Sequence, residues 1–149
     1  MSFQKAIPYV AIAISVAGFL LSLSGFLRDR SRLKIKSQYI PASQYDPEDE
    51  IMVTLMNQGR RTIILRLIGG TDQEGVSSGT FLDYEKGGVR LAENERHELH
   101  LRLSDIHQQT PDDPDIHYAE LWIEDSLGRK YPIPKSREHI QSMNRANAA

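Results

Sequence analysis

The sequence predicts an all-β protein, in which a single N-terminal transmembrane helix is followed by an antiparallel β-sandwich of about seven strands. Three observations support this prediction. A long apolar run near the N-terminus carries no charge, and the rest of the chain alternates apolar and polar residues in short segments that end in turn residues. Residues 1–36 hold six basic residues and one acid, whereas residues 41–135 hold 10 basic and 18 acidic residues. The formal net charge of −2 therefore averages two unlike parts of the chain.

Residues 7–27 form the expected transmembrane helix, with residues 1–6 as a short flank before it. At a rise of about 1.5 Å per residue, this uncharged run of 21 residues is long enough to cross the roughly 30 Å hydrocarbon core of a bilayer. A cleavable signal peptide is the alternative, because Ser22 and Ser24 form a small-residue cleavage pattern. The run is longer than a signal peptide needs, and Lys5 is the only basic residue before it, which favours the membrane span.

A basic cluster follows the apolar run at once, and consists of Arg28, Arg30, Arg32, Lys34 and Lys36. Basic residues this close to a helix end stay on the cytoplasmic side of a membrane. We therefore expect the N-terminus outside and the following domain in the cytoplasm, joined by a basic linker at residues 28–32. The cluster either contacts anionic lipid or serves only to stop translocation, and the second role is sufficient to explain it.

The apolar run also carries a row of small residues, here called the small-residue seam, which consists of Ala11, Ser15, Gly18, Ser22 and Gly25. On a helix that turns about 100° per residue they lie within about 40° of one line, whereas Leu20 lies on the opposite side. Small side chains let two helix backbones approach closely in lipid. The seam predicts a homo-oligomer or packing against a partner transmembrane helix, although small residues are also common in membrane helices generally.

The β-sandwich domain is expected over residues 33–135, followed by a flexible C-terminal tail at residues 136–149. The runs 51–56 and 63–68 lie on either side of Asn57-Gln58-Gly59-Arg60, which has turn chemistry, so we expect them to pair as a hairpin. The other expected strands lie at 33–39, 80–84, 89–91, 99–103, 119–124 and 130–133. Residues 69–79 and 108–115 are expected to be loops, because Gly and Ser dominate the first and Pro and Asp the second.

The alternation assigns one face of each strand to the core. By their place in it, Leu55, Leu65, Leu101 and Leu121 are expected to point inward. Pro132 and Pro134 flank Ile133, so the last strand should lie at a sheet edge, where a missing N–H does not interrupt a ladder.

Three motifs carry a resemblance. They are Asn57-x-Gly59-Arg60-x-x-Ile63 between two strands, the turn Leu91-Ala92-Glu93-Asn94-Glu95, and the closing segment Asp125-Ser126-Leu127-Gly128-Arg129-Lys130-Tyr131. Over residues 51–133 the chain resembles small bacterial and prophage membrane-anchored proteins with an immunoglobulin-like β-sandwich domain. Asn94 replaces the usual glycine, and Asn tolerates a positive φ. The resemblance implies an immunoglobulin-like fold on a membrane anchor, and it implies no activity.

Residues that could carry chemistry do not converge in the sequence. The chain has no Cys, which excludes a thiolate metal site and a cysteine nucleophile. His107 and His117 flank Asp112, Asp113 and Asp115, but calcium loops need denser oxygen spacing and a glycine turn. We therefore expect no catalytic residue, metal or cofactor, and the acidic balance of residues 41–135 argues against nucleic-acid binding. The alternative is a metal-dependent enzyme that uses the His107–His117 loop.

Four residues are candidates for a protein interface, namely Arg60, Arg61, Tyr118 and Trp122. The two arginines lie at the tip of the expected hairpin, where surface solubility is the simpler explanation for them. By alternation Trp122 shares the non-core side of its strand with Tyr118, and exposed aromatic residues often dominate interfaces. In a sandwich of this size, however, a single Trp more often lies in the core, which a one-residue bulge would allow by moving Trp122 inward.

These observations predict a non-enzymatic, single-pass protein of the bacterial inner membrane. Its cytoplasmic β-sandwich would bind another protein or hold copies of itself together, in a membrane-bound assembly or a prophage-encoded envelope function. A periplasmic sensor or binding domain with reversed topology is a further alternative. Because the domain and the inner leaflet are both negatively charged, we expect the domain to stand off the lipid, open to a partner.

Overall fold

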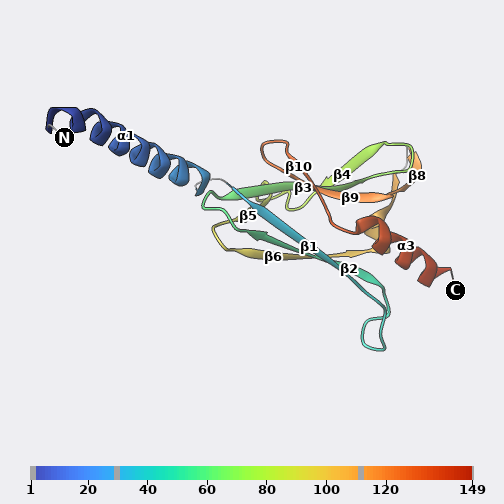
Figure 1. Ribbon diagram of the computed structural model, residues 1–149. Helices are drawn as coiled ribbons and strands as arrows, with labels where there is room; N and C mark the ends of the chain where they lie inside the picture. Colours follow the sequence, from blue (N-terminus) through green and yellow to red (C-terminus); the bar gives the residue numbers. More distant parts are fainter. Residues whose placement is uncertain (1–2, 29–30, 111–112, 149) are drawn as a thin grey trace.

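The computed structural model describes residues 3–28, 31–110 and 113–148, with side chains described for residues 9–26, 31–107 and 117–148. Helix α1 (Phe3–Arg28) projects from a mostly β domain (Figure 1). From Tyr9 to Phe26 it is exposed throughout, and this segment is long and apolar enough to cross a membrane. No other described part of the chain therefore covers this apolar helix.

The β-domain contains two antiparallel sheets. The first has the order β1-β2-β6, formed by β1 (Leu33–Ile40), β2 (Glu50–Asn57) and β6 (Arg96–Arg102). The second has the order β10-β9-β3-β4, formed by β10 (Lys130–Pro132), β9 (Glu120–Asp125), β3 (Ile63–Thr71) and β4 (Ser77–Phe81), and β5 (Val89–Leu91) also pairs with β3. As Pro132 requires, β10 lies at a sheet edge.

Buried side chains of both sheets form one core. The four leucines that the alternation places inward, Leu55, Leu65, Leu101 and Leu121, are all buried, with exposed fractions of 8% or less. They come from β2, β3, β6 and β9, so they represent both sheets. The prediction is confirmed because successive side chains of a strand point to opposite faces, and only one face of each of these strands meets the core.

The runs expected to form a hairpin, β2 and β3, lie in different sheets. β2 pairs with β1 and β6, whereas β3 pairs with β4, β5 and β9. Residues 58–62 therefore cross between the sheets. A turn motif does not distinguish these outcomes, because both a hairpin and a crossover require the chain to reverse direction.

The fully buried side chain of Asn57 holds this crossover in place. Its Oδ1 accepts the N–H of Gly59 at 2.9 Å, and its Nδ2 donates to the carbonyls of Arg61 at 2.8 Å and Leu91 at 3.1 Å. Leu91 belongs to β5 of the second sheet, so one carboxamide joins β2, the crossover and the opposite sheet.

The C-terminal segment expected to be a flexible tail contains helix α3 (Ser136–Asn147), which packs on the domain. Ile140 and Met143 point into the core, with exposed fractions of 3% and 0%. Ser136 Oγ accepts the N–H of Leu121 at 3.1 Å, and His139 Nε2 lies 3.1 Å from Ser37 Oγ. Two apolar residues on an otherwise polar helix are too sparse a stripe to indicate burial from sequence alone.

Both segments expected to be loops contain strand. β3 continues to Thr71 and β4 begins at Ser77, so the connection between them is short. A short helix, α2 (Leu103–Ile106), is followed by a small hairpin of β7 (His107–Thr110) and β8 (Asp113–His117), in place of the solvated loop. Gly and Pro often end strands, but the pairing observed here is compatible with both residue types.

Replacing Met143 with Ala is expected to lower the free energy of unfolding by about 2–5 kcal/mol, because the change leaves a cavity in the core. Urea unfolding of the full chain in detergent, followed by circular dichroism, measures this loss. The exposed neighbour Gln141→Ala is the control and should change little. A Met143→Ala chain as stable as the wild type would support the flexible tail instead.

Replacing Asn57 with Ala should lower the free energy of unfolding by at least about 2 kcal/mol, because it leaves several buried backbone groups without partners. The same urea titration measures the effect. Gln58→Ala, at an exposed neighbouring position, controls for local sequence change. Equal losses in the two variants would show that the Asn57 hydrogen bonds do not hold the crossover.

Candidate functional site

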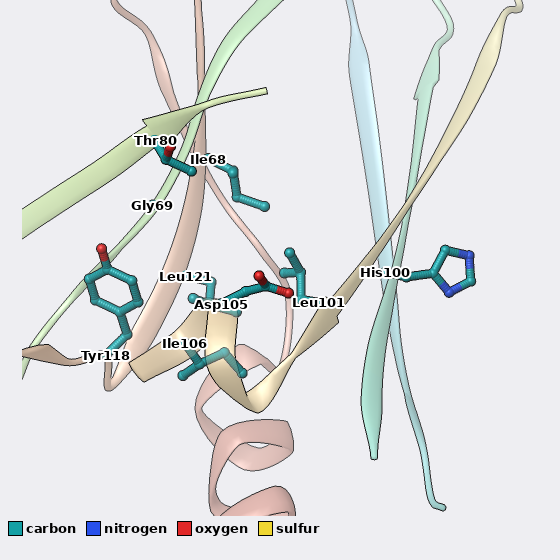
Figure 2. Close-up of a pocket in the computed structure, with 9 residues that line it drawn as sticks. All are labelled: Ile68, Gly69, Thr80, His100, Leu101, Asp105, Ile106, Tyr118 and Leu121. Carbon is teal, nitrogen blue, oxygen red and sulfur yellow. The ribbon is translucent and has the colours of Figure 1, made fainter. Parts of the chain in front are cut away.

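A small cavity of about 180 Å³ lies between the sheets near α2 (Figure 2). Its lining is mostly apolar and consists of Ile68, Gly69, Thr80, His100, Leu101, Asp105, Ile106, Tyr118 and Leu121. Pockets that enclose a drug-sized ligand usually measure about 300–1,000 Å³. This cavity is therefore too small to be a site of that kind.

His100 and Asp105 both border the cavity, but they do not form an acid–base pair. The imidazole of His100 points away from the cavity (Figure 2), and its Nδ1 lies 3.0 Å from Glu50 Oε1. Asp105 Oδ2 accepts the backbone N–H of Arg102 at 2.8 Å, at the start of α2. The described residues around the cavity thus do not place a nucleophile next to a general base.

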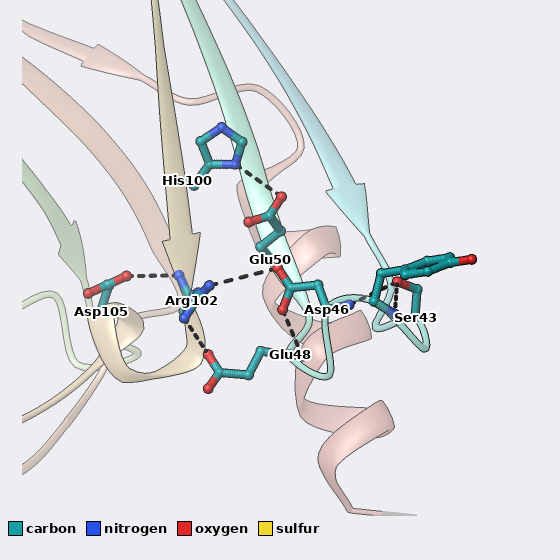
Figure 3. Close-up of polar contacts among 8 residues, drawn as sticks. Ser43, Asp46, Glu48, Glu50, His100, Arg102 and Asp105 are labelled. Carbon is teal, nitrogen blue, oxygen red and sulfur yellow. Dashed lines mark hydrogen bonds and ion pairs between the residues drawn. The ribbon is translucent and has the colours of Figure 1, made fainter.

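An acidic loop, residues 41–49, lies at the end of the domain opposite α1 (Figure 1). Arg102 fixes it, with Nη1 3.2 Å from Glu48 Oε2 and Nη2 3.7 Å from Asp46 Oδ2 (Figure 3). These ion pairs of Arg102 are exposed, so they contribute little to stability but limit where the loop can lie. Burial raises the pKa of Tyr39, and the charge of Asp49 raises it further.

His107 and His117 meet across the β7–β8 hairpin. Their Nδ1 atoms are in contact, their ring centroids lie 4.4 Å apart, and His107 Nε2 lies 3.2 Å from Asn144 Oδ1. Asp112 and the side chains of Asp113 and Asp115 lie outside the described residues. Within the described part of the chain, no group of three His, Cys, Asp or Glu could hold a metal ion, and two imidazoles are fewer ligands than a zinc site uses.

Tyr118 is a buried residue, which corrects its assignment to an exposed interface. It has an exposed fraction of 3% and belongs to the core. A Cβ at Gly70 would lie only 2.2 Å from Cγ of the Tyr118 ring, so the ring occupies the space that a larger residue would fill. Its hydroxyl lies 2.6 Å from Ser78 Oγ.

Trp122 is also buried, with an exposed fraction of 9%, but it lies outside the core cluster. Its ring packs on Gly69, where a Cβ would lie 2.7 Å from Cζ2 of the ring. Lys130, on β10, places its Nζ 4.0 Å from the centroid of the Trp122 ring. The irregular register with β3 occurs between Leu65 and Leu67, so no bulge at Trp122 moves it inward. Its Nε1 is buried without a hydrogen-bond partner among the described residues, so ring contacts hold it in place.

Both aromatic rings therefore depend on the pair Gly69-Gly70, which was expected to lie in a loop. The two glycines are neighbours within β3, so they leave space on opposite faces of the second sheet, Gly69 for the Trp122 ring and Gly70 for the Tyr118 ring. A glycine inside an alternating run often marks a close approach of this kind. That signal could have identified the packing, but only with the partner rings known.

Arg60 and Arg61 are exposed in the crossover between β2 and β3. The carbonyl of Arg32 accepts the N–H of Gln58 at 2.7 Å, so this connection lies beside the start of β1 and close to α1. Of the basic cluster, Arg32, Lys34 and Lys36 are exposed, whereas Arg30 and the side chain of Arg28 lie outside the described residues.

The β9–β10 turn is fixed by the buried carboxylate of Asp125. It accepts the N–H groups of Leu127 and Arg129 and the phenol of Tyr131, each at 2.9 Å. Burial raises the pKa of Tyr131, the hydrogen bond to Asp125 raises it further, and Arg129 opposes the rise. The result is a rigid turn that presents Leu127 to solvent, with an exposed fraction of 72%.

The small-residue seam lies along the exposed surface of α1. Ser15 Oγ donates to the carbonyl of Ala11 at 2.9 Å, and a Cβ at Gly18 or Gly25 would meet nothing within 4 Å beyond the adjacent backbone of its own helix. The described residues therefore leave the seam uncovered.

No family model matches the chain, and no curated protein matches it. Among solved structures, the Northeast Structural Genomics Consortium target SoR45 is similar over 72% of this chain and 83% of its own, with 16% sequence identity and a TM-score of 0.30.

Proposed function

We propose that this protein is a non-enzymatic, single-pass membrane protein whose β-domain binds other proteins or assembles copies of the chain. The exposure of α1 carries the proposal. An apolar segment from Tyr9 to Phe26 that the fold leaves uncovered needs a bilayer or other helices around it. The open seam on the same helix offers a surface for a second helix.

An immunoglobulin-like sandwich is the finer description that we propose for the β-domain. Immunoglobulin domains place strands A, B and E in one sheet and C, F and G in the other. The order β1-β2-β6 corresponds to A-B-E, and β10-β9-β3 corresponds to G-F-C. The crossover held by Asn57 then takes the place of the B–C connection. Such domains serve many functions, so the fold supports a binding role without specifying a partner.

We further propose that α1 crosses the bacterial inner membrane with the β-domain in the cytoplasm. Five basic residues follow the apolar run within ten positions, and Arg32, Lys34 and Lys36 among them are exposed. Positive charge next to a span favours the cytoplasmic side.

A C-terminal green fluorescent protein fusion is expected to fluoresce, and a C-terminal alkaline phosphatase fusion to be inactive. Alkaline phosphatase needs disulfide bonds that form in the periplasm and not in the cytoplasm. Enzyme assays and whole-cell fluorescence on matched fusions measure the difference. The reverse pattern would move the β-domain to the periplasm and favour the sensor alternative.

The double change Ser15→Leu and Gly18→Leu should abolish association between α1 helices, because the larger side chains keep the two backbones apart. Association is measured with a membrane two-hybrid assay on the full chain. Leu20→Phe adds bulk on the opposite side of the helix and is the control. Unchanged association in the double variant would remove the seam from the proposal.

A further inference from the structure

The charge of the β-domain separates along its length. Residues 41–50 contain four acids and no basic residue, whereas residues 58–62 contain Arg60 and Arg61 and no acid. The first segment lies at the end opposite α1, and the second lies at the end next to it (Figure 1). The overall negative charge of the domain therefore does not describe the surface nearest to α1.

Turns from both sheets make up that surface, here called the α1 end. Residues 58–62 lie next to Arg32, and the N–H of Asn94 donates to the carbonyl of Asn57 at 2.7 Å, which brings in the turn 92–95. The N–H of Ser126 donates to the carbonyl of Ile64 at 2.8 Å, so the β9–β10 turn lies beside the start of β3. The α1 end thus combines residues 58–62, 92–95 and 126–129.

The α1 end presents apolar side chains next to basic ones. Leu127 is the most exposed of them, at 72%, and its neighbour Ile64 is 37% exposed. Arg129 follows two residues later on the same rigid turn and is exposed, as are Arg60 and Arg61. An exposed leucine on a turn that the Asp125 carboxylate holds in shape, with arginines around it, suits the boundary between headgroups and acyl chains.

Most acids at this end are engaged within the protein. Asp125 is buried with its three donors, Glu95 Oε2 accepts the N–H of Ala92 at 2.7 Å, and Glu98 is paired with Arg96. Glu93 and Glu95 are both exposed in the turn 92–95. Arg60, Arg61 and Arg129 therefore outnumber the exposed acids of the α1-end turns by three to two.

Distance explains why the acidic loop, residues 41–49, has little effect there. Leu33 follows Arg28 by five residues, so β1 begins within about 18 Å of the end of α1. The eight residues of β1 then extend about 26 Å to the acidic loop. At physiological ionic strength charges are screened over about 8 Å, so a charged surface near the end of α1 interacts with the α1 end and not with residues 41–49.

We propose that the α1 end of the β-domain docks on anionic lipid headgroups of the membrane that α1 spans. Leu127 enters the headgroup region, and Arg60, Arg61 and Arg129 lie against lipid phosphates. The proposal rests on the membrane anchoring proposed above, and it replaces the expectation that the acidic domain stands off the lipid.

The absence of Cys allows a direct test, because a single introduced cysteine can be labelled uniquely. Leu127→Cys carries an environment-sensitive fluorophore in the full chain, reconstituted in nanodiscs of phosphatidylcholine alone or with phosphatidylglycerol, each containing a spin-labelled quencher lipid. We expect several-fold stronger quenching in the anionic discs. Tyr45→Cys, 91% exposed in the acidic loop, is the control and should be quenched weakly in both discs.

A charge variant tests the role of the arginines. Arg60→Gln, Arg61→Gln and Arg129→Gln together should reduce quenching at position 127 to its level in neutral discs. Lys86→Gln, Arg137→Gln and Arg145→Gln remove the same charge elsewhere on the surface and should leave quenching unchanged. Fluorescence of the single tryptophan, Trp122, reports whether each variant is folded, and the comparison of neutral with anionic discs stands even if a variant unfolds.

The outcomes separate the two proposals. Chain that does not co-elute with nanodiscs would overturn the membrane anchor, and the docking with it. Chain that enters the discs but shows no quenching at position 127 would overturn the docking alone. Equal quenching in neutral and anionic discs would also overturn it, because the proposed contact requires lipid phosphate charge.

Discussion

A buried carboxamide must satisfy its hydrogen bonds inside the protein, and at Asn57, the last residue of β2, the partners that do so come from the crossover and from the opposite sheet. Its bond to the carbonyl of Leu91 reaches a strand 34 residues further along the chain. Because Leu91 pairs with Ile63, the same bond sets where β3 begins. The crossover with Arg60 and Arg61, the turn 92–95 and the start of β3 are thereby gathered at the end of the domain next to α1.

The second sheet receives aromatic rings on both faces, and this affects where function can lie. Gly69 and Gly70 provide the space, and Tyr118 and Trp122 fill it from opposite sides. Neither aromatic residue is then available to a partner, since both are buried. Lys130 over the Trp122 ring places a charge above the outer face. Among the surfaces that remain for recognition are the ends of the domain, where turns present arginines at one end and acids at the other.

A short connection between helix and domain makes local charge more important than net charge. Four residues, 29–32, separate α1 from β1. Because this connection is short, the α1 end of the domain stays close to the end of α1. It therefore meets any surface there at a high effective concentration. The acidic loop, beyond the length of β1, is screened from that region. A domain that is acidic overall can therefore present a basic surface on the side that its tether selects.

The sequence by itself determined the features that are set by neighbouring residues. An uncharged run of 21 residues predicts a helix long enough for a membrane, and the alternation predicts most strands and the inward leucines, because both patterns follow from local backbone geometry. Only the tertiary structure decided which strands pair, that Trp122 and Tyr118 are buried, and that α3 covers the core through Ile140 and Met143. It also decided how the charges separate into two ends. Each of these depends on contacts between residues far apart in the chain, such as Asn57 with Leu91 or Ser37 with His139, and a local pattern does not contain them.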